Sequence, residues 1–274
     1  MLRKGDLTQG GITGTLLHFT LPMMVGSFLQ QCYNIADTLI VGQCIGAGAL
    51  AAVGSAYTLM VFLISVLLGL AMGSGTVFSL HYGAGNHVAL RRSIFSSFVL
   101  IGIVTLILNV AVFIWLDPIL RLLQVPQDIY GMMRSYSWII FCGIVFTFIY
   151  NFYASLLRAV GDSVTPLWFL AVSVVLNIAL DLFFILQLDW GIQGAAAATV
   201  LAQGVAALGI IIYTYRRRPE LRWHHEDMCF DRTCLKEIAS FSTLTCVQQS
   251  VMNLGILMIQ GLVNLSLIHI SEPT

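Results

Sequence analysis

Charged side chains are scarce in this sequence. Asp, Glu, Lys and Arg make up 9% of the 274 residues, against about 25% in ordinary soluble domains. A soluble domain of this length needs far more charge to cover its surface, and a disordered chain is charge-rich and poor in apolar residues. A nucleic-acid-binding protein usually has an excess of basic residues. This sequence has none, because 13 Lys and Arg balance 13 Asp and Glu. With these classes excluded, the apolar fraction of 58% indicates a polytopic membrane protein.

Alternating segments of about ten residues, which mark an outer-membrane barrel, are also missing. Seven continuous apolar runs are present instead, each as long as the roughly 20 residues that a spanning helix needs. Backbone groups in lipid have no water partners, so the runs should be helical. We therefore predict an all-α membrane protein with spans near 15–42, 51–82, 93–116, 135–157, 166–188, 194–215 and 235–267.

Basic residues predict the orientation, because cytoplasmic loops of membrane proteins carry an excess of Lys and Arg. With the N-terminus inside, only Arg121 and Arg134 fall on the outer side. We expect a multi-pass protein of the cytoplasmic membrane. The basic segment 216–234 would then be a cytoplasmic linker between a six-helix bundle, residues 1–215, and a seventh helix, residues 235–265, that is detached or loosely packed.

The seventh run resembles the first at an offset of 219 residues, with Gln30 matching Gln249 and Asn34 matching Asn253. A six-helix unit followed by the start of a second copy is a known transporter plan. The sequence therefore predicts one half of such a protein plus the first helix of the next half. The tail 266–274 resembles a translated sequencing adapter, and a natural short tail is the alternative.

The six cysteines give no disulfide framework. Four potential ligands cluster in and after the linker, at His224, His225, Cys229 and Cys234. Their spacing is not that of a standard zinc finger or ribbon. We therefore predict no metal site and a solvated loop, with zinc as the weaker alternative.

Only two acidic residues fall deep inside apolar runs, Asp37 and Asp181. A charge at the bilayer centre costs about 2.5–3.5 kcal/mol on insertion scales, so such residues usually face the bundle interior and serve a pathway. A polar lock between helices is the alternative. No Lys or Arg lies at similar depth in either run. Because low dielectric favours the neutral carboxyl, the pair suits proton carriage.

Polar residues accompany both carboxylates. Asn34 and Asn177 lie within a turn of Asp37 and Asp181, on the same helix faces. Interhelical hydrogen bonding explains single Asn or Tyr residues equally well. The candidates for lining a cavity are Gln30, Tyr33, Asn34, Tyr150, Asn151 and Tyr153.

Two other features concern helix geometry. Pro22 removes a backbone hydrogen bond in the first run, which predicts a kink there. It could be a moving part or a static bend. Small residues four apart, Gly69 with Gly73 and Gly194 with Ala198, predict close helix packing and no chemical role.

Taken together, residues 8–264 resemble the multidrug and toxic compound extrusion (MATE) family, nearest its DinF-like branch. The resemblance depends on several motifs jointly, since each alone is weak. They are Pro22 with Tyr33-Asn-Ile-Ala-Asp37-Thr and Gly42, Tyr82-Gly-Ala-Gly85, Leu157-Arg-Ala-Val-Gly-Asp162 with Pro166, Asn177-x3-Asp181, and Gly191-x2-Gly194-Ala-Ala-Ala-Ala-Thr199.

The resemblance implies twelve helices in two six-helix lobes, and export of cationic or amphipathic compounds in exchange for protons or sodium, with no other cofactor. It implies a cation site at Asp37, Asn177, Asp181 and Thr199, and bending of the first helix at its proline. Helices 8–12 of the family pattern are absent, so the second lobe would be a missing partner. Small-molecule substrates and the lipid bilayer are the other expected partners.

Three other functions compete with this interpretation. A lipid-linked oligosaccharide flippase of the same superfamily should line its cavity with basic residues, and none lies clearly at depth. A retinal-type seven-helix receptor needs a deep Lys in its last helix, whereas Lys236 lies at the start of that run. An intramembrane enzyme is disfavoured because there is no H-E-x-x-H or G-x-S-x-G motif.

Overall fold

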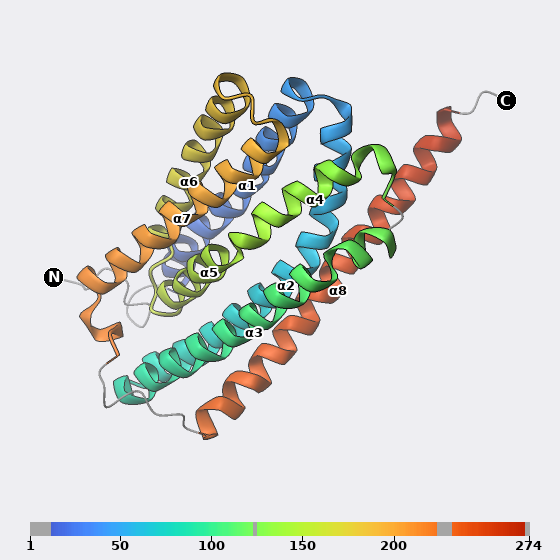
Figure 1. Cartoon of the computed structure of the whole chain (residues 1–274). Helices are drawn as coiled ribbons and strands as arrows, with labels where there is room; N and C mark the ends of the chain where they lie inside the picture. The colour runs from blue at the N-terminus through green and yellow to red at the C-terminus, as the bar shows by residue number, and fades with distance from the viewer. Residues whose placement is uncertain (1–11, 123–124, 224–231, 272–274) are drawn as a thin grey trace.

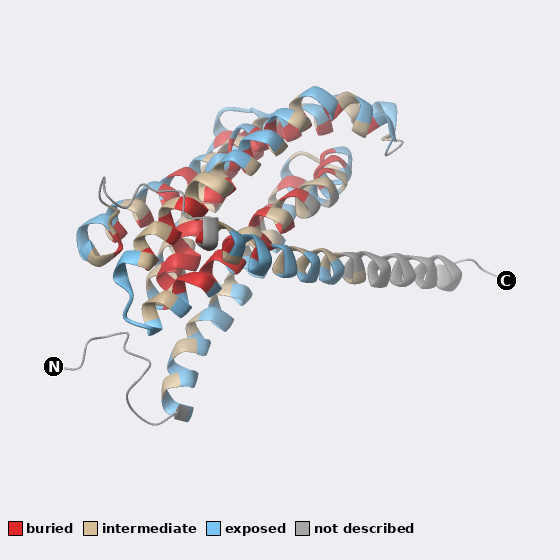
Figure 2. Cartoon of the chain, turned by 90° about the horizontal axis from the view of Figure 1, so that it is seen from below, coloured by how far each residue is buried: buried red, intermediate tan, exposed pale blue. Residues whose placement is uncertain are grey.

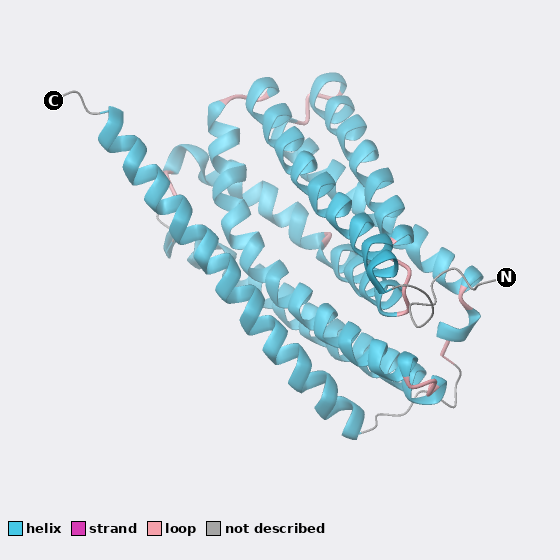
Figure 3. Ribbon diagram, turned by 180° about the vertical axis from the view of Figure 1, so that it is seen from behind, coloured by secondary structure: helices cyan, strands magenta, loops and turns pink. Residues whose placement is uncertain are grey.

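The computed structural model describes residues 12–122, 125–223 and 232–271. All of its regular elements in these ranges are helices, and they pack as a bundle (Figure 1; Figure 3). In chain order they are α1 (Ile12–Cys44), α2 (Ala47–Gly83), α3 (His87–Leu122), α4 (Gln127–Cys142), α5 (Ile144–Ala159), α6 (Val164–Leu182), the π-helix η1 (Phe183–Gln187), α7 (Gly191–Arg217), the 3-10 helix η2 (Pro219–Leu221) and α8 (Arg232–Ser271).

The helices confirm the predicted all-α membrane fold, because each apolar run corresponds to one helix or one broken helix. Among the described residues, α2, α3, α6 with η1, and α7 are each long and apolar enough to cross a membrane. Helices α4 and α5 form a fifth span that bends by 46° between them. The chain is a multi-pass membrane protein.

The bend between α4 and α5 lies at Gly143 and has a packing cause. The side chain of Val200 on α7 occupies the space that a Cβ at Gly143 would need. The Gly143 amide still bonds to the carbonyl of Ile139 at 3.3 Å, so this donor stays paired at the break, as a low-dielectric region requires. An uninterrupted apolar run does not show such a break, which is why the sequence predicts a single span there.

Large apolar side chains cover the outside of the bundle, and the buried residues face inward (Figure 2). Phe28 is 71% exposed, and Leu106 and Val175 are exposed to a similar extent. A helix that is apolar all round is typical of a membrane span. The outward side chains are therefore the surface that meets lipid.

Aromatic side chains join α2, α3 and α5 inside the bundle. The ring of Phe152 lies 5.9 Å from Phe78 and 5.3 Å from Phe98, both close to edge-on. Edge-to-face ring pairs at such separations contribute about 0.5–1.5 kcal/mol beyond their area burial. This cluster fixes the three helices against one another.

Helix α8 packs tightly on α2, so the prediction of a detached or loosely packed seventh helix is wrong. A Cβ at Gly69 of α2 would lie 2.6 Å from the Cα of Cys246. The hydroxyl of Ser242 and the thiol of Cys246 bond to carbonyl oxygens of α2, at 3.3 and 3.4 Å. The predicted close-packing role of Gly69 and Gly73 is therefore confirmed, and their partner is α8 (Figure 3).

The segment predicted as a linker, 216–234, is partly helical. Helix α7 ends at Arg217, η2 follows at once, and α8 begins at Arg232. Cys234 is buried, and its sulfur lies 3.0 Å from the Ser93 hydroxyl on α3. His224, His225 and Cys229, the other members of the weaker zinc alternative, lie outside the described residues.

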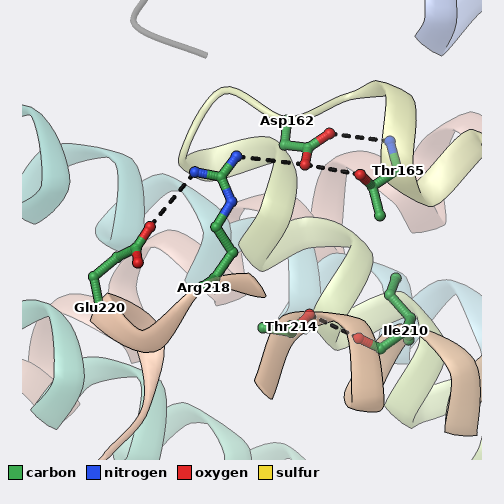
Figure 4. A network of polar contacts seen from close by, with 6 residues as sticks. All are labelled: Asp162, Thr165, Ile210, Thr214, Arg218 and Glu220. Carbon is green, nitrogen blue, oxygen red and sulfur yellow. Dashed lines mark hydrogen bonds and ion pairs between the residues drawn. The ribbon is translucent and has the colours of Figure 1, made fainter. Parts of the chain in front are cut away.

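A network of ion pairs ties the turn before α6 to the end of α7 (Figure 4). Asp162 accepts hydrogen bonds from the backbone N–H and the hydroxyl of Thr165, at 3.0 and 2.8 Å. Arg218 lies 3.5 Å from both Asp162 and Glu220. The Asp162 side chain is only 12% exposed and that of Arg218 19%, so the pair is partly shielded from water.

We expect Asp162→Ala to lower the free energy of unfolding by about 1–2 kcal/mol, since it removes a helix N-terminal cap as well as an ion pair. Thermal unfolding in detergent measures the change. Asp162→Asn is the matched control, because the amide oxygen keeps the hydrogen bond from Thr165 while the ion pair with Arg218 is lost. Equal destabilisation by the two variants would show that the ion pair, not the cap, carries the effect.

Candidate functional site

The two deep carboxylates face the interior between three neighbouring helices. Helices α1, α6 and α7 pack side by side (Figure 1), with Asp37 on α1 and Asp181 on α6. Asp181 is fully buried and Asp37 is 9% exposed. Both point inward because the opposite faces of their helices carry the apolar side chains that meet lipid.

The two carboxyl groups lie close enough inside the bundle to interact electrostatically. Each also keeps one buried oxygen, Oδ1 in both cases, without a hydrogen-bond partner among the described residues. Two neighbouring carboxylates repel each other unless a proton or another cation lies between them. An unpartnered buried oxygen is costly unless a ligand satisfies it, so this pair has the properties of a cation site.

Asn177 connects Asp181 to α7. In the orientation that satisfies both ends of its amide, its nitrogen donates to Oδ2 of Asp181 at 2.9 Å. Its oxygen then accepts from the Thr199 hydroxyl at 3.3 Å and from the Thr199 backbone N–H at 3.2 Å. Thr199 comes within reach because α7 is lined with alanine here, which lets α6 approach closely.

Tyr33 closes the site on the α1 side. Its hydroxyl lies 3.3 Å from the Thr199 hydroxyl, and it stands one helical turn before Asp37. The structure therefore brings together five of the predicted residues around one point. They are Tyr33, Asp37, Asn177, Asp181 and Thr199.

Tyr136 on α4 is buried near this site, and the sequence analysis did not include it among the candidates. It is 5% exposed and lies within electrostatic range of Tyr33, Asp37 and Asp181. It stands in an amphipathic stretch whose polar residues also face solvent and lipid. A tyrosine hydroxyl can both donate and accept, so it can serve a neighbouring carboxyl in either protonation state.

The remaining predicted cavity residues lie outside this cluster. Gln30 is exposed, and the Asn34 amide donates to Gln31 of its own helix at 3.2 Å. Tyr150 donates to the Pro166 carbonyl at 3.0 Å, so it fixes the start of α6.

Two more candidates from α5 have local roles. Asn151 donates to the Thr147 carbonyl of its own helix at 2.8 Å. Tyr153 is buried against the ring of Phe152.

α1 is one continuous helix through Pro22, so the predicted kink is not a break in the helix.

A second small polar group adjoins the site. A cavity of about 20 Å³ lies beside Thr199, and its polar lining also includes Thr147 and Gln203. The Thr147 hydroxyl donates to Gln203. A space of this size holds one water molecule. The cluster therefore extends by one helical turn along α7, away from the carboxylates.

The ligand set is suited to a small hard cation. Carboxylate, amide and hydroxyl oxygens are the groups that hold such ions, and Asp37, Asp181, Asn177 and Thr199 supply all three kinds in one cluster. The same carboxyl pair can instead hold a proton between its members. No group of three or more His, Cys, Asp or Glu arranged to hold a metal ion occurs in the part of the chain that the structure describes.

Known proteins resemble this chain in both sequence and fold. The MatE family model matches residues 22–183. The probable multidrug resistance protein YpnP of Bacillus subtilis is 36% identical over 79% of this chain and 49% of its own length. The multidrug export protein MepA of Staphylococcus saprophyticus is 31% identical over 74% of this chain and 45% of its own. The chain thus spans about half the length of these relatives.

Among solved structures, an outward-facing multidrug resistance MATE transporter of the MOP superfamily superimposes with a TM-score of 0.87. It is 24% identical to this chain, and the match covers 94% of this chain and 57% of the other. That identity establishes the shared fold alone. The sequence matches go further. The family model covers more than half of this chain, and one relative is 36% identical over 79% of this chain. The chain therefore belongs to the MatE family.

Proposed function

We propose that this chain is the first half of a multidrug exporter and that its buried carboxyl pair binds the coupling ion. The observation that carries the proposal is the meeting of Asp37 and Asp181 in an apolar bundle, each with an unpartnered oxygen. Two carboxylates of like charge at low dielectric repel each other strongly. A bound proton or sodium ion relieves that repulsion. Binding of the ion to the carboxyl pair is therefore coupled to how closely α1 and α6 pack.

This coupling supplies a mechanism. A cation from outside neutralises or bridges the pair, α1 bends near Pro22, and the cavity that holds the exported compound narrows. Release of the ion inside reverses the change. The driving force is adequate, at about 2.3 kcal/mol per charge per 100 mV of membrane potential, plus about 1.4 kcal/mol per pH unit for a proton.

The proposed substrates are cationic or amphipathic compounds, in keeping with the names of the two relatives as multidrug resistance and export proteins. The proposed setting is the cytoplasmic membrane with the N-terminus inside. Export needs the second half that those relatives have in addition, because a binding site between two lobes opens to alternate sides only when both lobes can move. Transport rather than enzymatic chemistry is therefore the proposed activity.

A chimera tests the proposal. Residues 1–264 of this chain are joined to the second half of the Bacillus subtilis relative and expressed in cells that lack their own drug exporters. We expect the chimera to export ethidium against its gradient, and the export to stop when ionophores collapse the proton and sodium gradients. The 274-residue chain alone should give no export. A chimera that reaches the membrane and moves no ethidium would contradict the proposal.

A further inference from the structure

A cavity of about 280 Å³ lies where α2, α3 and α8 meet, and it shares no residue with the carboxyl site. Its volume is at the lower end of ligand pockets, which measure about 300–1,000 Å³. Since α2 and α3 are both long and apolar enough to cross a membrane, the turn that joins them lies outside the hydrocarbon core, on the side where lipid headgroups are found. The lining residues are His81, Asn86, Val88, Ala89, Arg92, Cys234 and Glu237.

One wall of this cavity is suited to an anion. The Nε atom of Arg92 is buried without a hydrogen-bond partner among the described residues. Asn86 accepts from the Ala89 backbone N–H at 3.0 Å through its oxygen, which leaves its NH₂ group to donate. Asn86 immediately precedes α3, where the helix dipole favours negative charge, and Arg92 lies in the second turn of the same helix. A phosphate at this wall would satisfy the guanidinium.

The wall of the cavity that α8 contributes carries a negative charge. Glu237 of α8 is 45% exposed on its side chain, and its carboxylate lies 3.6 Å from His81. A cavity with a guanidinium on α3 and a carboxylate on α8 matches a ligand that has a phosphate and a cation a few bonds apart. Clusters of basic residues between spanning helices are a recognised type of lipid headgroup site, and the carboxylate adds a requirement for a positive group.

We propose that this cavity binds the headgroup of a phosphoethanolamine lipid. The phosphate lies against Arg92 and Asn86, and the primary ammonium lies against Glu237. A choline headgroup has no N–H to donate to the carboxylate, and a glycerol headgroup has no cation. The cavity therefore selects phosphatidylethanolamine over lipids with either of those headgroups, and bound lipid holds α8 to the α2–α3 turn.

Native mass spectrometry of the detergent-purified chain tests this selectivity. The chain is mixed with equal amounts of phosphatidylethanolamine, phosphatidylcholine and phosphatidylglycerol that have the same acyl chains. We expect retention of phosphatidylethanolamine to exceed that of each of the others by about tenfold or more, as one additional charge-assisted hydrogen bond would give. Equal retention of the three lipids would overturn the proposal.

Charge-neutral variants separate the two walls. Arg92→Gln should lower the retention of all three lipids, because each of them carries the phosphate that Arg92 holds. Glu237→Gln should instead remove the preference for phosphatidylethanolamine over phosphatidylcholine. Lys236→Gln is the matched control, because Lys236 is exposed beside Glu237 and does not line the cavity. A loss of the preference in the control, or its persistence in Glu237→Gln, contradicts the assignment.

Inorganic phosphate distinguishes a lipid site from a free-anion site. At millimolar concentration it should leave retention of phosphatidylethanolamine unchanged, because it has neither the ammonium nor the acyl chains of the lipid. Displacement of the lipid by inorganic phosphate would show a simple anion site and would overturn the proposal.

Discussion

Replacing Asp181 with Asn is expected to abolish cation binding by this chain. Asp181 is fully buried and shares its site with Asp37, Asn177 and Thr199. Asparagine has nearly the same shape but carries no charge, so a bound sodium ion loses half of its anionic ligands. Breaking a buried charge pair costs about 3–5 kcal/mol, which lowers affinity by more than about a hundredfold.

Equilibrium binding of radioactive sodium to the purified chain at several pH values is the measurement. Where sodium binds, its affinity should fall as the pH falls, because protonating either carboxyl removes an anionic ligand. Where the site takes protons alone, proton uptake on acidification should fall in Asp181→Asn while sodium binding is absent throughout. If Asp181→Asn binds the ion as tightly as the unaltered chain does, the ion-binding site lies elsewhere and the assignment is wrong.

Two further variants define the site. Asp37→Asn should weaken binding as severely as Asp181→Asn, because each carboxyl group supplies one of the two negative charges of the site. Asp117→Asn is the control of identical chemistry, since Asp117 is an exposed carboxylate of α3 that pairs with Arg134 at 2.8 Å. A similar loss in all three variants would indicate a general effect of removing negative charge.

The spans and the carboxyl pair could be predicted from sequence because both depend on the cost of polarity in lipid. Long apolar runs have one stable conformation there. A carboxylate within an apolar run usually faces the interior of the helix bundle, because exposure to lipid is costly. Asp37 and Asp181 are the only two acidic residues deep inside such runs. The family resemblance implies that Asn177 and Thr199 belong to the same site, and the structure places Asn177 beside Asp181 and Thr199 beside Asn177.

Polar residues that lack charge were harder to assign. A Tyr or Asn costs little in a membrane helix wherever one carbonyl is available. Tyr150 finds the carbonyl of Pro166, and Asn151 that of Thr147, so neither needs the cavity. Tyr136 lies on α4, which is bent by 46° from α5 at Gly143, where Val200 of another helix packs against the glycine. Contacts between distant segments of this kind leave no local pattern.

The packing of α8 was mispredicted for a related reason. The basic segment 216–234 has the composition of a linker, and linkers usually separate independent units. The small residues of α2 did indicate a close helix neighbour, but small residues do not specify which helix it is. In the structure, Ser242 and Cys246 present small side chains that fit against Gly69 and Gly73.

Gly73→Val is therefore expected to separate α8 from the bundle. A Cβ at this position would collide with the backbone of Ser242 and Phe241, and backbone atoms cannot move aside as the end of a side chain can. Overpacking a tight contact costs about 1–3 kcal/mol, and the hydrogen bond from Ser242 to the carbonyl of Leu70, at 3.3 Å, would be lost as well. In a membrane there is no hydrophobic driving force to offset the loss, because lipid is as apolar as the helix surface.

The measurement uses the basic segment between α7 and α8 as a cleavage site. Trypsin cuts the purified, N-terminally tagged chain there, and recovery of the tagged fragment shows whether α8 stays bound. We expect α8 to be recovered with the bundle in the unaltered chain and lost in Gly73→Val. Gly54→Val is the matched control on the same helix, because a Cβ at Gly54 meets nothing within 4 Å, and it should retain α8. Retention of α8 in Gly73→Val would mean that contacts with α3, where Cys234 meets Ser93 at 3.0 Å, are sufficient to hold the helix.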